Sequence, residues 1–207
     1  MKRPKLTRTR LSIGAAITVL GAALAVGAAA APFGGSTTYK VALAPLNGSR
    51  AQGDATIVLS GDQRSAIVTI RAAGLERGGP HISHIHGLST NGQAVDSTCP
   101  TIAQDSDRDG FVELAEGQVK YGPILVDFMN IDPDQDGRIN FTQRIMLNGS
   151  EGATPLPFRH IVVHGMSVGA VGAGTPGEVD GTAGFKTVLP VLCGEIQQQT
   201  GGFTIRF

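Results

Sequence analysis

The chain has 207 residues, and its 17 basic and 17 acidic side chains give a formal net charge of zero. The zero net charge depends on the N-terminal end, because five of the basic residues lie within the first ten positions, at Lys2, Arg3, Lys5, Arg8 and Arg10. Without these five, 12 basic residues face 17 acidic ones and the net charge becomes −5. A chain of that charge lacks the basic face that phosphate backbones require, which excludes nucleic acid as an expected partner.

The first 31 residues are typical of a secretory signal peptide. An uncharged stretch rich in Ala, Leu, Ile, Val and Gly covers residues 11–31 and ends in four alanines that suit a signal peptidase. The alternative is an uncleaved anchor, since 21 uncharged residues are enough to span a bilayer. We therefore expect an exported, secreted protein that meets a membrane only if this segment is kept. Residues 32–38 form an expected linker, and residues 39–207 form one domain.

Beyond the linker, short apolar runs alternate with turn residues, which is the pattern of antiparallel β-strands. The clearest runs cover residues 39–43, 55–59, 66–70, 161–163 and 187–189. No stretch of the exported part keeps a 3.6-residue apolar period for long, and the one expected helix is brief, around residues 113–119. With 29 Gly and 11 Pro, the chain is predicted to be all-β, a loop-rich Greek-key β-sandwich or barrel.

Cys99 and Cys193 are the two cysteines of the chain. In the oxidising compartment that export implies, two cysteines most simply form one disulfide. It would close a loop of roughly 95 residues, for which the chain-entropy model gives a stabilisation of about 4–5 kcal/mol at most. The alternative is a pair of buried free thiols.

Residues 105–116, DSDRDGFVELAE, match the 12-position calcium loop of an EF-hand. Gly110 occupies position 6, where the chain must turn sharply, and Phe111 would offer its carbonyl at position 7. The alternative is an acidic surface turn. The preceding residues 99–104 are too short and Pro-broken for an entering helix, so we expect an isolated loop of the weak extracellular class. Acidic side chains stand at positions 1, 3, 5, 9 and 12: Asp105, Asp107, Asp109, Glu113 and Glu116.

A second, incomplete match begins at residue 132 with DPDQDGRINFTQ. Its Asp132, Asp134 and Asp136 fit a second calcium loop, but Gln143 stands where the bidentate carboxylate belongs. The flanking residues 124–128 and 138–141 resemble strands, and Asp-Gly between two such runs favours a hairpin turn over calcium. The two interpretations are compatible if a weakly held ion lies in the turn.

All five histidines fall into two groups, His81, His84 and His86 in the first and His160 and His164 in the second. On a strand, His84 and His86 face the same side, and His164 could meet them from a neighbouring strand. Three converging imidazoles suit copper or zinc. The odd spacing of His81 makes it a supporting residue rather than a ligand. His160 is expected to be an ordinary surface or turn histidine. The alternative is that all five serve packing and hydrogen bonding.

Two of these segments carry a resemblance to a known family. Residues 79–86, GPHISHIH, with AGL at 73–75, resemble the copper-site strand of copper/zinc superoxide dismutases. Residues 159–165, RHIVVHG, resemble the later strand that supplies another copper ligand. The LCG at 192–194 is similar to the second half of the disulfide of those enzymes, with Cys99 as partner. The order HIHG, CPT, DxDxDG, VVHG and LCG is also similar to secreted actinobacterial CHRD-like domains.

The resemblance, which covers roughly residues 39–197, implies a superoxide dismutase-like fold with copper at His84, His86 and His164. The chain departs from the enzymes in three places. It has no histidine between His86 and His160 to bridge copper and zinc or to hold zinc. Pro190 stands where the enzymes place an anion-guiding arginine, and Val168 stands where they have an aspartate. These departures argue against a zinc site and against efficient dismutation.

The sequence patterns and the resemblance leave two candidate functions. The first is an exported, non-catalytic calcium-binding module. The second is a copper-binding oxidoreductase or copper carrier that uses the three histidines. A hydrolase has little support, because no nucleophile elbow or oriented Ser/His/Asp set is visible.

Overall fold

The computed structural model describes residues 35–128, 131, 133, 136–147, 152–170 and 177–199. The expected signal peptide at 1–31 therefore lies outside the described residues, as do Asp132 and Asp134. Within the described ranges, no helix combines the length and apolar character that a membrane crossing needs.

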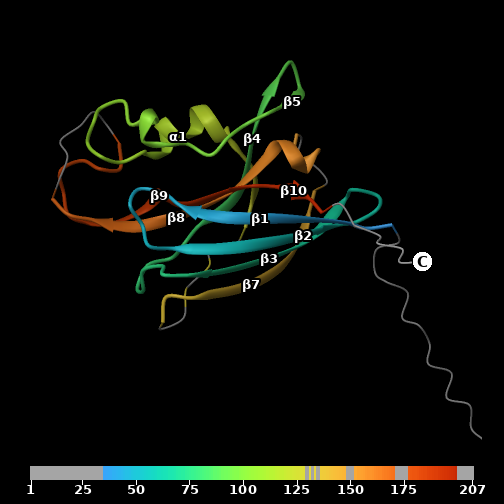
Figure 1. The fold of residues 1–207 in the computed structure, drawn as a ribbon, viewed down its shortest axis with the longest axis horizontal. Coiled ribbons are helices and arrows are strands. Elements are labelled where there is room, and N and C mark those ends of the chain that lie inside the picture. Colours follow the sequence, from blue (N-terminus) through green and yellow to red (C-terminus); the bar gives the residue numbers. More distant parts are fainter. Residues whose placement is uncertain are drawn as a thin grey trace, which may run out of the picture. The chain divides into compact units, whose positions relative to one another are not determined.

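This part of the chain forms ten strands, one α-helix and two short 3-10 helices (Figure 1). The helices are η1 (Ile102–Gln104), α1 (Leu114–Tyr121) and η2 (Leu156–Phe158). The strands are β1 (Thr37–Pro45), β2 (Gln52–Leu59), β3 (Ser65–Ala73), β4 (Ser83–Thr90), β5 (Gln93–Val95), β6 (Ile124–Asp127), β7 (Ile139–Met146), β8 (Arg159–Val168), β9 (Gly184–Glu195) and β10 (Gln197–Gln198). The predicted mainly β fold with one short helix is confirmed. Strand β1 begins at Thr37, inside the expected linker.

The strands are joined by antiparallel pairing in the order β5-β4-β8-β9-β1-β2-β3-β7, with β6 added to β4 and β10 to β1. Strand β1 joins the two halves of this path, because residues 37–43 pair with β2 while Ala44 and Pro45 pair with β9. Figure 1 shows β1, β2, β3 and β7 side by side. The neighbours β4–β8 and β3–β7 are far apart in sequence, so the connections cross between the two halves, as in Greek-key sandwiches.

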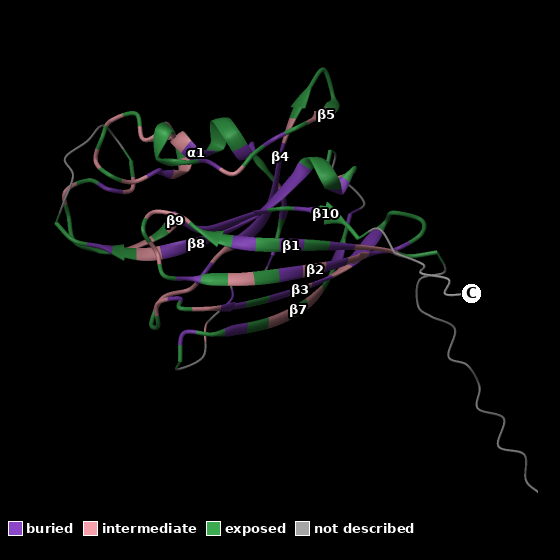
Figure 2. Cartoon of the chain, viewed as in Figure 1, coloured by how far each residue is buried: buried purple, intermediate pink, exposed green. Residues whose placement is uncertain are grey.

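The core lies between the two halves of the path. Alternate residues of β2 and β3 are buried, among them Ile57 and Ile70, and they share one apolar cluster with Ile85 of β4 and Ile161 and Val163 of β8. This period of two is visible as alternating buried and exposed bands on the strands in Figure 2. Full burial of each such side chain contributes about 1.5–3 kcal/mol.

Strand β8 is covered on both of its faces, as are the buried stretches of β4 and β9. Every residue of 159–165 is buried. The side chains of Ile161 and Val163 lie in the main core. On the opposite face, Val162 packs with Tyr121 and Cys193 in a second apolar cluster. Residues 97–122, which we call the cover segment, include α1 and supply Tyr121 to this cluster. The face of β4 and β8 that carries the histidines is therefore enclosed.

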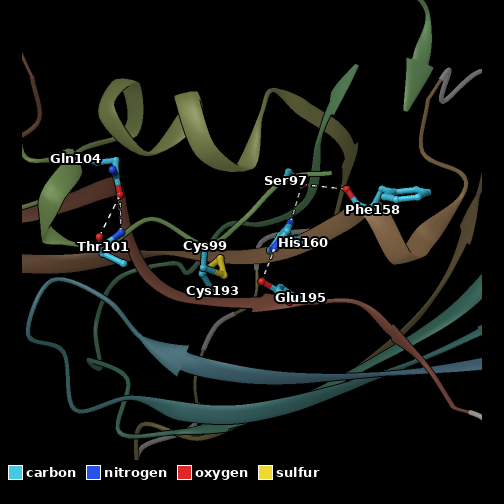
Figure 3. The surroundings of a disulfide bond; sticks show 8 residues. All are labelled: Ser97, Cys99, Thr101, Gln104, Phe158, His160, Cys193 and Glu195. Carbon is cyan, nitrogen blue, oxygen red and sulfur yellow. Dashed lines mark hydrogen bonds and ion pairs between the residues drawn. A yellow bond between two sulfur atoms is a disulfide. The ribbon is translucent and has the colours of Figure 1, made fainter. Parts of the chain in front are cut away.

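The disulfide between Cys99 and Cys193 is present, with 5.8 Å between the two Cα atoms. It links the start of the cover segment to β9, as Figure 3 shows. Directly after Cys99, Thr101 and Gln104 cap η1 reciprocally. The predicted disulfide is confirmed, and the alternative of two free thiols is excluded.

The hairpin predicted around residue 132 is wrong. Strand β6 pairs with β4, whereas β7 pairs along its whole length with β3 in the other half of the path. The connection between β6 and β7 therefore crosses between the two halves and does not reverse within one. Burial of apolar side chains determines this pairing. Val126 enters the common core from β6 beside β4, and Ile139 enters it from β7 beside β3. The helix, expected at 113–119, begins one residue later and ends at Tyr121.

Candidate metal centre

Two neighbouring strands bring three histidines together under the cover segment. His84 and His86 lie two residues apart on β4 and share a face, and His164 comes from β8, which pairs with β4. One ring nitrogen from each histidine lies within 4.8 Å of those of the other two. The rings are 5.2–5.8 Å apart between centroids. We call His84, His86 and His164 the three-histidine cluster.

Each ring of the cluster faces an oxygen acceptor on its outer side, through a hydrogen bond for His86 and His164 and an ion-pair contact for His84. Nδ1 of His86 lies 2.9 Å from the carbonyl of Gly122, and Nδ1 of His164 lies 2.7 Å from that of Val188. Nε2 of His84 lies 3.3 Å from a carboxylate oxygen of Asp127. Carbonyl and carboxylate oxygens only accept, so the ring nitrogen facing each of them carries the proton. The opposite nitrogen of each ring then has a free lone pair.

Those opposite nitrogens have no partner. Nδ1 of His84, Nε2 of His86 and Nε2 of His164 are all buried without a hydrogen bond. Leaving one buried polar group unpaired costs about 1–3 kcal/mol, so three in one place require an explanation. A metal ion bound by the three lone pairs would satisfy all of them, and the residues present therefore fit a metal.

Burial keeps the cluster neutral. The side chains of His86 and His164 are 1% and 0% exposed, and burial lowers the pKa of His86 to about 4 and that of His164 to about 3. Burial also lowers the pKa of His84, although the charge of Asp127 opposes the shift. A neutral imidazole is the form that binds a metal. The cluster is therefore ready to bind at neutral pH without first losing protons.

We expect the metal-free protein to lose stability as the pH falls below about 6.5, the ordinary histidine value. His86 and His164 take up protons in the unfolded state near that pH, but in the folded state only near pH 4 and 3. Between these limits each depressed pKa steepens the loss by about 1.4 kcal/mol per pH unit. Urea unfolding in the presence of a chelator, repeated between pH 7 and pH 4, measures how steeply the free energy of unfolding falls with pH. A His86→Gln variant should show a shallower fall. An unchanged fall would contradict the view that buried, neutral His86 causes part of it.

The two other histidines are also buried. His81 contacts the main chain of the cluster, since its Nδ1 lies 2.9 Å from the carbonyl of His164. His160 was expected at the surface or in a turn, and this expectation is wrong, because only 1% of it is exposed. Its Nδ1 lies 2.9 Å from the hydroxyl of Ser97 and its Nε2 lies 3.8 Å from Glu195 (Figure 3). The cover segment, which sequence patterns do not place, buries it.

The acidic loop at residues 105–116 brings part of the predicted calcium set together. Carboxylate oxygens of Asp105, Asp107 and Asp109 lie within 4.8 Å of one another. Asp105 accepts a hydrogen bond of 3.0 Å from the main chain of Gly110, whose φ of +95° is the turn that position 6 requires. Burial raises the pKa of Asp109, and the neighbouring carboxylates raise it further. The three carboxylates therefore repel one another in the absence of a cation.

The remaining members of that set make hydrogen bonds and packing contacts of their own. The carboxylate of Glu113 is buried and accepts a hydrogen bond from the main chain of Val179. Glu116 accepts bonds of 2.6 Å from the main chain and the hydroxyl of Ser106. The half-buried ring of Phe111 packs with a small apolar cluster that includes Val179. Glu113 and Phe111 thus fasten the loop to the segment around Val179, whereas Glu116 closes the loop on itself. In the second acidic motif, Asp136 is exposed, and Asp132 and Asp134 lie outside the described residues.

Asp127, Gly122 and Val188 are partners of the three-histidine cluster that sequence patterns do not reveal. Two of them act through main-chain carbonyls, which carry no side-chain signature. Asp127 lies in an expected strand, residues 124–128, but its place opposite His84 follows from the pairing of β6 with β4.

Fold and site together define a mostly antiparallel β protein with a buried three-histidine cluster. The sequence matches no protein-family model, and a search of curated proteins gave no match. The superoxide dismutase-like and CHRD-like resemblance therefore rests on the motifs alone.

Proposed function

We propose that this chain is an exported copper-binding protein, whose centre is the three-histidine cluster. One observation carries the proposal: the buried, neutral imidazoles of His84, His86 and His164 each have one nitrogen without a hydrogen-bond partner, and the three rings lie together. Packing and hydrogen bonding, the competing explanation for these histidines, give no reason for three rings, each with an unpartnered nitrogen, to bring ring nitrogens within 4.8 Å of one another.

The donor set favours copper over other ions. Imidazole nitrogen suits copper and zinc, whereas calcium and magnesium prefer oxygen. For a given nitrogen site, divalent copper binds more tightly than zinc. The copper-site resemblance of the strands that carry His84, His86 and His164 supports the same ion.

The protein's own residues would hold, orient and shield the ion. The carbonyls of Gly122 and Val188 fix the rings of His86 and His164, so that a nitrogen of each is presented at the cluster. Tyr121 packs its ring 4.7 Å from that of His86 and helps to exclude water. Bound copper would supply one-electron chemistry by alternating between its two oxidation states.

We assign the site to copper carriage or slow one-electron transfer, not to efficient superoxide dismutation. Pro190, where the enzymes have an anion-guiding arginine, lies on β9 and pairs with His164. A cation that would attract a small anion is therefore missing from this position. With no histidine between His86 and His160, a bridging imidazole is also missing.

A second candidate function is calcium binding by the acidic loop, which would stabilise the cover segment. The hydrogen bond from Gly110 to Asp105 and the grouping of three aspartates favour it. The loop begins six residues after Cys99, so an ion there and the disulfide would hold the same segment. Binding of the extracellular class, with a Kd of about 10⁻⁴–10⁻³ M, would make the effect visible only at millimolar calcium.

Metal content tests both proposals. We expect the exported protein with an intact disulfide to retain about one copper per chain after dialysis against copper and then against metal-free buffer, since one cluster supplies the ligands. Its melting temperature should rise when calcium is added to millimolar levels. A calcium response without retained copper would leave a calcium-stabilised module and return the histidines to a structural role. Retained copper without a calcium response would remove the second function alone.

A further inference from the structure

Asp127 differs from the other two groups that hold the cluster from outside. It lies on β6 directly opposite His84 on β4, and its carboxylate is 3.3 Å from Nε2 of that ring. The side chain of Asp127 is 76% exposed, while that of His84 is 8% exposed. The other two outer partners are neutral main-chain carbonyls, from Gly122 and Val188. His84 is thus the member of the cluster whose outer partner is a side chain carrying charge and reaching solvent.

The contact decides which nitrogen His84 presents. With Nε2 protonated against the carboxylate, the lone pair is on Nδ1, and Nδ1 is the buried, unpartnered nitrogen of this ring. His86 and His164 have the opposite arrangement, with Nδ1 held and Nε2 free. Without an acceptor at Asp127, the proton of His84 could reside on either nitrogen, and one of the two tautomers cannot bind a metal.

The contact also brings negative charge to the site. Divalent copper bound by three neutral imidazoles leaves two positive charges in a buried place, whereas monovalent copper leaves one. A carboxylate behind His84 therefore stabilises the oxidised ion more than the reduced one. Because Asp127 is exposed, solvent and salt reduce this effect, so we expect a change of about two- to tenfold and not more.

We propose that Asp127 is a positioning residue, which fixes the tautomer of His84 and biases the three-histidine cluster towards oxidised copper. This inference rests on the proposed copper function. It adds to that function a side chain outside the ligand set that controls both the strength of binding and the preferred oxidation state.

Two substitutions separate the tautomer from the charge. Asp127→Asn keeps an oxygen that can accept from Nε2 of His84 but removes the charge, whereas Asp127→Ala removes both. Asp54→Asn is the matched control, because Asp54 is an exposed aspartate on β2, which pairs with β1 and β3. The probes are copper(I) and copper(II) in competition with chelators of known affinity, the reduction potential of the bound copper, and zinc as a redox-silent ion.

We expect Asp127→Ala to weaken copper(II) and zinc by about 10- to 100-fold. Asp127→Asn should leave copper(I) binding close to wild type and weaken copper(II) and zinc, both divalent, by about two- to tenfold. The lower copper(II)-to-copper(I) affinity ratio raises the potential, by about 59 mV at tenfold. Asp54→Asn should match wild type in every measurement. Unchanged affinity in Asp127→Ala overturns the positioning role, and an unchanged potential in Asp127→Asn overturns the charge effect. Wild-type protein that binds no copper instead overturns the proposed function itself.

Discussion

Replacement of His164 by phenylalanine is expected to abolish copper retention. We expect the affinity for copper to fall by at least about 10³-fold, since the site loses one of its three ligands and roughly a third of its metal–ligand bonds. His164 is fully buried, and its Nδ1 is held by the carbonyl of Val188. Phenylalanine has a similar shape and removes one orphaned nitrogen. The metal-free variant should therefore remain folded, and elemental analysis after dialysis measures the loss.

His160→Gln is the matched control for this experiment. His160 is buried on the same strand as His164, but it lies outside the three-histidine cluster and contacts Ser97 and Glu195. Its substitution should leave copper stoichiometry unchanged. Equal copper loss in both variants would point to general disruption of β8, and retained copper in His164→Phe would exclude the cluster as the site. Circular dichroism and the calcium response establish that both variants are folded.

Removal of the disulfide by Cys99→Ser together with Cys193→Ser is expected to lower the free energy of unfolding by up to about 4–5 kcal/mol. The bond joins residues 94 positions apart, so its loss releases a large part of the unfolded chain from constraint. Cys193 is also fully enclosed beside Val162 and Tyr121. Urea unfolding at fixed pH measures the difference.

The same variant should release copper faster than wild type. Cys99 and Tyr121 pack in one apolar cluster, Tyr121 lies against His86, and the next residue, Gly122, holds Nδ1 of that histidine. A loosened cover segment would therefore free a ligand ring. Transfer of copper to a chelator gives the rate, and wild type treated with reductant should behave like the variant. Equal release rates with and without the disulfide would show that the cover segment does not restrain the site.

Several features follow from local sequence alone. Alternation of apolar residues predicts the strands, because successive side chains on a strand point to opposite faces wherever the strand lies. The same period places His84 and His86 on one face. Two cysteines in an exported chain predict the observed disulfide between Cys99 and Cys193. The spacing of Asp105, Asp107 and Asp109 around Gly110 predicts their grouping, because a tight turn closes within a few residues.

Other features were decided by tertiary structure. The flanks of residue 132 look like a hairpin, yet β6 pairs with β4 and β7 with β3, because burial of Val126 and Ile139 in the common core outweighs the local turn signal. His160 is buried by a segment some sixty positions away, and Asp127 reaches His84 only through strand pairing. The local sequence around a residue determines which nearby residues share its face of a strand. Which distant strand or segment covers it depends on how the whole chain buries its apolar surface, and that choice also sets which ring nitrogen each histidine keeps free.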